Sequence, residues 1–149
     1  MLRNRKYKSG SIWALWRWTD VDSEYIVRLH VIKTPWWAIC VHWIIKPDPE
    51  PWLHDHPVSF FSLVLKGWYT EKRVVDKFYT GFTPTFRSIN HTNRITGSDW
   101  DRHSIVQVAP EGAVTLCFMG PKTREWGFHT PDGWVMWKDY YTKQRAEKD

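Results

Sequence analysis

Short apolar runs, separated by turn residues, dominate the pattern of this chain. Tyr25–Ile32 alternates apolar and polar residues, whereas Trp36–Ile45 and Phe60–Leu65 are almost continuously apolar. Further short strands are expected at 68–75, 77–79, 85–89, 91–95, 104–108, 113–119, 125–129 and 135–137. Glycine and proline separate these runs, as in Pro110-Glu111-Gly112. Many short strands with regular turns predict an all-β sandwich or barrel.

The same pattern predicts one domain with two polar ends. Residues 1–10 form a basic tail, residues 11–141 the β domain and residues 142–149 a polar C-terminal tail. The polar segment 138–149 fits a short helix or a frayed end. Residues 11–19 fit a short helix or a strand. Residues 46–51 hold three prolines, which lack backbone donors and exclude regular structure there. A hairpin about Lys66-Gly67 is expected to join the strands at 60–65 and 68–75.

Composition adds limits on partners. The chain has 149 residues, a net charge of +5, a pI near 9.3 and twelve tryptophans. This charge is compatible with a small anionic molecule, a nucleotide or a nucleic acid, and it favours none of them strongly. Tryptophans fill cores and also line ligand sites and oligomer interfaces, so a homodimer is a further expectation.

Cys40 and Cys117 lie in apolar strand-like runs. Such positions predict small buried thiols instead of a disulfide, which fits a cytoplasmic setting. We expect no cleavable signal peptide, because the basic start runs into a short apolar stretch that ends at Arg17. No apolar run approaches the roughly 20 residues that span a bilayer, so no membrane partner is expected.

His54 and His56 carry the clearest chemical signal. On an extended strand, residues i and i+2 point to one face, so the two imidazoles can aim at one metal ion. Asp55 points to the opposite face and is therefore a poor ligand candidate. The alternative is a turn whose histidines form local hydrogen bonds. The apolar run Phe60–Leu65 behind the pair predicts a rigid support.

This segment resembles the first motif of the cupin superfamily, in which His-x-His is followed by a glycine at the next turn. His54, His56 and Gly67 stand at matching positions, whereas Phe60 occupies the place of the usual glutamate ligand. The chain is therefore similar to three-histidine cupins, including small cupin-like proteins of phages and bacteria. The resemblance covers about residues 50–141. It implies a cupin jelly roll, a double-stranded β-helix, with a metal site in the barrel.

In cupins a later strand supplies another histidine. His103 directly precedes the strand at 104–108 and matches this role best, with His91 as the alternative. The resemblance does not choose among Fe(II), Zn, Ni and Mn, although Fe(II) is favoured by likeness to thiol dioxygenases.

Other residues are candidates for proton transfer or substrate binding near the metal. Tyr69 and Glu71 share a strand face and are expected to handle protons, and Glu71 also fits a fourth ligand or a carboxylate behind the ligands. Arg94, Arg124 and His91 are expected to contact an anionic substrate, because a planar guanidinium binds carboxylate or phosphate through two hydrogen bonds.

Three functional classes follow. The first is a metal-dependent enzyme, with Fe(II)-dependent oxygenation of a small anionic molecule as the leading reaction. The second is a non-catalytic module that binds a nucleotide or sugar by stacking and charge. The third is a structural or assembly protein with tryptophans at an oligomer interface.

Overall fold

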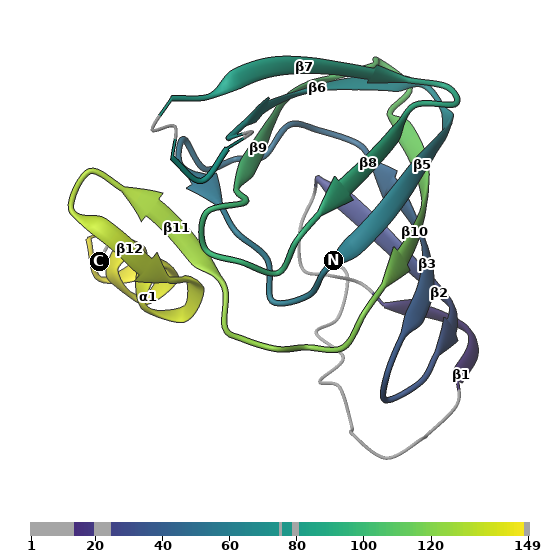
Figure 1. Cartoon of the computed structure of the whole chain (residues 1–149), viewed down its shortest axis with the longest axis horizontal. Coiled ribbons are helices and arrows are strands. Elements are labelled where there is room, and N and C mark those ends of the chain that lie inside the picture. The colour runs from purple at the N-terminus through teal and green to yellow at the C-terminus, as the bar shows by residue number, and fades with distance from the viewer. Residues whose placement is uncertain (1–13, 20–24, 75, 79–80, 148–149) are drawn as a thin grey trace.

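The structure, a computed structural model, describes residues 14–19, 25–74, 76–78 and 81–147. In these ranges the strands form two antiparallel six-stranded sheets that face each other (Figure 1). The first sheet has the order β1 (Ala14–Thr19), β2 (Ile26–Lys33), β3 (Ala38–Ile44), β10 (Ala113–Met119), β5 (Phe60–Lys66) and β8 (Thr92–Ile95). The second has the order β12 (Gly133–Met136), β11 (Gly127–Thr130), β4 (Leu53–His54), β9 (His103–Val108), β6 (Trp68–Arg73) and β7 (Thr83–Ser88). The all-β prediction is confirmed.

The core lies between the two sheets, where alternate side chains of each strand point inward. Ile44, Val64 and Ala113 of the first sheet meet Tyr69 of the second in one buried cluster. Because strand residues alternate, the neighbours of these core residues face outward. Trp43, Phe61, Leu65 and Phe118 accordingly leave an exposed apolar surface on β3, β5 and β10.

Cys40 and Cys117 are buried free thiols, as the apolar runs predicted. They lie opposite each other on β3 and β10. Burial raises the pKa of the Cys117 thiol to about 12, so it packs as a small neutral side chain.

The expected hairpin about Lys66-Gly67 is wrong. β5 pairs with β8 and β10, whereas β6 pairs with β7 and β9, so the chain crosses between the sheets at Gly67. Gly67 has φ +72°, and a Cβ there would lie 2.1 Å from the carbonyl oxygen of Gly112. A glycine is required because the β9–β10 turn passes directly against this corner.

Two further expectations differ from the structure. Lys77 and Phe78 form a turn instead of a strand, while Tyr79 lies outside the described residues. The expected boundary at residue 142 falls inside α1 (Trp137–Ala146), which packs on β11 and β12, so the short helix is the alternative that the structure confirms for this segment (Figure 1). The basic tail of residues 1–10 lies outside the described residues. Within the described ranges, no helix has the length and apolar character to span a membrane.

Candidate metal centre

Three histidines converge between the sheets. His54 ends β4, His103 begins β9, and the two are direct partners in the antiparallel ladder. His56 follows two residues after His54. The ring centroids are 4.8–5.0 Å apart in all three pairs, and one ring nitrogen from each residue lies within 4.8 Å of the others. The structure thus brings together His54, His56 and His103.

The backbone that brings the histidines together differs from the continuous strand predicted from the sequence. β4 ends at His54, so His56 lies in the loop before β5 and not on a continuous strand. His56 packs edge-on against Phe60, with ring centroids 5.1 Å apart. Phe60 occupies the place where the related motif has a glutamate, and here it supports a ligand candidate by contact.

The imidazoles are suited to bind a cation as neutral ligands. Burial lowers the pKa of His54 to about 4, an effect that nearby Asp48 partly opposes. Burial also lowers the pKa of His56 well below its ordinary value, and the neighbouring His103 adds to the effect. At neutral pH these two rings therefore keep a lone pair for a metal.

His56 also has a buried polar atom that the protein leaves unsatisfied. Its Nδ1 has no hydrogen-bond partner among the described residues. Such an atom usually costs about 1–3 kcal/mol of folding free energy, and an ion coordinated by this nitrogen would remove that cost. Three nitrogen donors are acceptable to several divalent transition metals. The side chains present therefore fit a metal ion.

A buried carboxylate orients His103. Nδ1 of His103 donates to Oε2 of Glu71 over 2.5 Å, which leaves Nε2 of His103 available to a metal. Arg87 Nε donates to Oε1 of the same carboxylate over 2.6 Å, and Asn93 Nδ2 donates over 3.2 Å. Burial acts to raise the pKa of Glu71, but the hydrogen bond from His103 and the neighbouring Arg87 outweigh it and lower the pKa to about 2.

Further ion pairs fix the residues behind Glu71. Arg73 donates to the side chain of Asn93 and forms an ion pair with Asp101 at 3.1 Å. Asp101 is buried and also accepts a hydrogen bond from the backbone nitrogen of Thr96 over 2.7 Å. The orientation of His103 is therefore set by a network that includes residues of β6, β7 and β8.

Asp55 lies between His54 and His56 in sequence but points away from both rings, as expected. Its buried carboxylate accepts hydrogen bonds from Gly127 N (2.8 Å), Trp134 Nε1 (2.9 Å) and His129 Nε2 (3.0 Å). It also pairs with Arg124 at 3.1 Å. These bonds fasten the histidine loop to the C-terminal strands.

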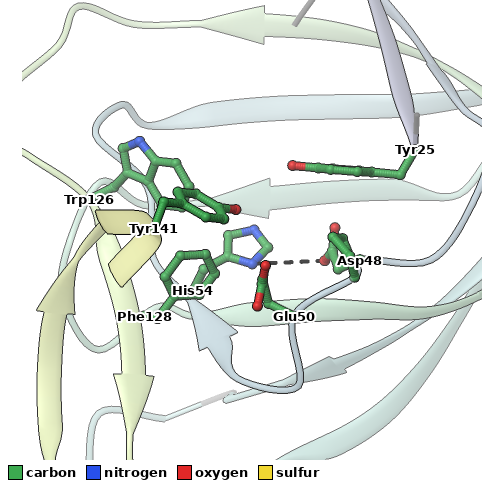
Figure 2. Close-up of a pocket in the computed structure, with 8 residues that line it drawn as sticks. Tyr25, Asp48, Glu50, His54, Trp126, Phe128 and Tyr141 are labelled. Carbon is green, nitrogen blue, oxygen red and sulfur yellow. Dashed lines mark ion pairs between the residues drawn. The ribbon is translucent and has the colours of Figure 1, made fainter. Parts of the chain in front are cut away.

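A small cavity of about 50 Å³ lies on the other side of His54. Figure 2 shows His54 between Asp48 and a group of aromatic side chains, with Tyr25 across from them. The cavity is lined by Tyr25, Asp48, Pro49, Glu50, His54, Trp126, Phe128 and Tyr141. His54 Nδ1 lies 3.8 Å from Asp48 Oδ2, so this imidazole belongs to both the histidine cluster and the cavity.

The other predicted site residues lie in different places. His91 is exposed in the turn between β7 and β8, and Thr92 after it pairs with Leu63. Ile95, at the opposite end of β8, pairs with Phe60 on the side of the histidines. His91 therefore does not join the cluster.

Arg94 does not face the barrel interior as expected. It is exposed between the buried residues Asn93 and Ile95, because successive strand residues alternate. Tyr69 is buried in the core. Burial, with the charge of Glu71, raises the pKa of Tyr69 to about 12, so its phenol keeps its proton at neutral pH.

The sequence did not reveal that Arg87 and Asn93 hold Glu71, or that Asp55 anchors the histidine loop. Alternation in Asn93-Arg94-Ile95 was a usable signal, since an inward Ile95 also places Asn93 inward. The bonds from Asp55 join positions 69 to 79 residues apart in sequence. No local pattern contains that information.

The comparison with solved structures supports the fold. No family model and no curated protein matches the chain. Among solved structures it is similar to an RmlC-like cupin from Shewanella frigidimarina, with a TM-score of 0.53, 16% identity and coverage of 73% of this chain and 86% of that one. It is also similar to a proposed mannose-6-phosphate isomerase from Ralstonia eutropha (TM-score 0.55, 14% identity, coverage 77% and 99%).

A third similar structure is Fe(II) HppE, with a TM-score of 0.53 and 15% identity. The match covers 77% of this chain and 62% of that one. At these identities the likeness establishes architecture and leaves chemistry open. The two facing sheets and the structural neighbours together show that this chain has the cupin jelly-roll fold.

Proposed function

We propose that the protein is a metal-dependent enzyme in which His54, His56 and His103 hold one divalent ion. The observation that carries the proposal is the convergence of three imidazoles, one of which, His56, also has a buried ring nitrogen without a hydrogen-bond partner among the described residues. A purely structural histidine cluster would be expected to satisfy its buried nitrogens with hydrogen bonds. Three protein ligands also leave coordination positions open, as catalytic sites require.

Fe(II)-dependent oxygenation of a small molecule is the reaction we favour. Bound Fe(II) supplies open positions where dioxygen and substrate meet. A neighbour that contains Fe(II), HppE, supports this choice. Zn, Ni or Mn in the same ligands would support hydrolysis or isomerisation instead, and the likeness to the proposed isomerase keeps that class as the second candidate.

The protein side chains around the metal have separable tasks in this proposal. Glu71 accepts the Nδ1 proton of His103 and so fixes the ring with Nε2 toward the ion. We therefore assign Glu71 to positioning instead of proton transfer. Trp126 and Phe128 lie beside the His54 ring, with centroids 6.0 Å and 6.3 Å away, and form an apolar wall on that side.

The test uses untagged protein reconstituted with Fe(II) without oxygen, followed by metal analysis and oxygen uptake on a panel of amines, thiols, carboxylates and sugars. We expect about one iron per chain and uptake with at least one panel member. His56→Ala should bind iron more weakly and lose uptake, while His91→Ala, which changes an exposed histidine outside the cluster, should keep both iron and uptake. Metal-free wild-type protein would contradict the proposal. Stoichiometric retention of an unmodified ligand without turnover would favour a binding module.

A further inference from the structure

We propose that the cavity beside His54 binds a positively charged head group, a primary or methylated ammonium, of a small molecule. As a statement about the substrate, this rests on the proposed metal-dependent function. As a statement about binding, it rests on the charge, the aromatic rings and the size of the cavity alone.

Charge gives the first argument. The described residues that line the cavity include two carboxylates, Asp48 and Glu50, and neither lysine nor arginine. Glu50 is held in place because its Oε2 accepts hydrogen bonds from Tyr140 Oη (2.7 Å) and Gln144 Nε2 (3.1 Å). Asp48 is held by the backbone nitrogen of Ile105, which donates to Oδ2 over 2.7 Å. Two fixed carboxylates at one small cavity attract a cation and repel an anion.

Aromatic rings give the second argument. Tyr25, Trp126, Phe128 and Tyr141 form most of the remaining wall. The rings of Trp126 and Phe128 lie 5.5 Å apart, and Phe128 meets Tyr141 edge-on at 5.8 Å. Ring faces carry negative charge density and attract ammonium groups, most strongly where water is excluded. An uncharged apolar group would bind less well in this cavity, because the two carboxylates would lie beside it.

The protonation state of Tyr141 is compatible with a bound cation. Burial raises the pKa of the Tyr141 phenol, and the neighbouring Tyr25 and Glu50 raise it further. Tyr141 therefore stays neutral and contributes an uncharged aromatic ring to the cavity wall.

Size limits the ligand to a head group inside the cavity. A volume of about 50 Å³ holds a few atoms. Because His54 belongs to both the cavity and the metal cluster, groups attached to the ammonium lie beside the metal centre.

The arginines near the metal centre do not favour an anionic head group. Arg124 is paired with Asp55, Arg87 with Glu71 and Arg73 with Asp101. Arg94, which the sequence suggested for an anion, is exposed on the outer face of β8. Each of these arginines is therefore either matched by a buried carboxylate or directed away from the cavity.

The test titrates metal-loaded full-length protein with methylammonium and trimethylammonium, and with tert-butanol and acetate as neutral and anionic probes of similar size. Calorimetry gives affinities, and indole N–H signals in NMR spectra locate the probe at Trp126. We expect an ammonium probe to bind at least about tenfold more tightly than tert-butanol, and acetate not to bind at the cavity. Equal affinity for the ammonium and neutral probes would overturn the inference.

Two substitutions test whether the carboxylates of Glu50 and Asp48 attract the ammonium group. Glu50→Gln keeps an oxygen for Tyr140 and removes the charge, and Asp48→Asn does the same at the other wall. Each should weaken ammonium binding by about fivefold or more, whereas Glu111→Gln, an exposed change in the β9–β10 turn, should not. Unchanged affinity in both cavity variants would overturn the inference.

Metal analysis of the same samples separates this inference from the proposed function. Protein that holds metal but does not prefer ammonium probes would refute the cavity assignment and leave the metal centre standing. Protein that binds ammonium at the cavity but holds no metal would support the cavity assignment and refute the enzyme.

Discussion

Glu71 and Asp55 are both fully buried carboxylates, yet they work on opposite sides of the histidine cluster. Glu71 is 17 residues after His54 and touches the His103 ring directly. Asp55 is adjacent to His54 and His56 in sequence, and its bonds go to the C-terminal strands β11 and β12. The residue beside the ligands in sequence anchors the loop, and the distant one orients a ligand.

The partners of the two carboxylates explain the difference. Glu71 lies on β6 next to β9, so its inward side chain reaches His103 at the start of that strand. Asp55 follows His54 and therefore takes the opposite direction, toward donors that β11 and β12 supply. We expect loss of Asp55 to affect mainly stability, and loss of Glu71 to affect mainly metal affinity.

Asp55→Asn should have the largest effect on stability. A neutral amide cannot accept bonds from all the donors around it, so Gly127, Trp134 and Arg124 compete for one oxygen. We expect the free energy of unfolding to fall by about 2–4 kcal/mol in chemical denaturation. Asp132→Asn, an exposed change in the β11–β12 turn, should stay within about 0.5 kcal/mol. A cost at Asp55 as small as at Asp132 would refute the anchoring role.

Glu71→Gln should reduce metal affinity about 10–100-fold, because His103 loses the charged acceptor that fixes its ring. The measurement is a competition titration with a metal indicator, made where both proteins are folded. The Asp55→Asn protein should lose less affinity in that assay. If the two variants lost metal affinity equally, the assignment of Glu71 to ligand orientation and of Asp55 to loop anchoring would be wrong.

Lowering the pH should reduce the free energy of unfolding of the metal-free protein. We expect this effect to be smaller than those of the two substitutions. The folded pKa of Glu71, about 2, lies below its ordinary value of 4.5. Its charge therefore stabilises the fold fully above about pH 4.5, and this contribution is lost as the pH falls toward 2. His54, with a folded pKa of about 4 against 6.5, favours the unfolded chain as the pH falls from 6.5 to 4, because only the unfolded chain takes up the proton there.

Denaturant unfolding at a series of pH values measures this loss. Glu71→Gln should be less stable than wild type at pH 7 and should flatten the decline between pH 4.5 and 2.5. The same steep decline in both proteins would show that Glu71 does not contribute it.

The sequence predicted the elements better than their pairing. Alternation placed a strand close to β2, and apolar runs placed strands close to β5 and β10. It could not show that β5 and β6 belong to different sheets, since Gly67 looks the same in a hairpin and in a crossover. Pairing depends on contacts between distant segments, such as the passage of Gly112 against Gly67.

The candidate site was predictable to a similar degree. His54, His56 and His103 were found from spacing and from the likeness to cupins, and the structure brings them together. The outward direction of Arg94 and the bonds of Asp55 were not found, because they depend on register and on segments far apart in the chain.

The central claim is that three histidines bind one ion. X-ray absorption spectroscopy of zinc-loaded protein tests it most directly, because imidazole rings give a recognisable outer-shell signal. The account predicts three imidazole nitrogens at about 2.0–2.1 Å in wild type and in His91→Ala, and two in His56→Ala. Fewer than three imidazoles in wild type, or the same number in His56→Ala, would contradict it.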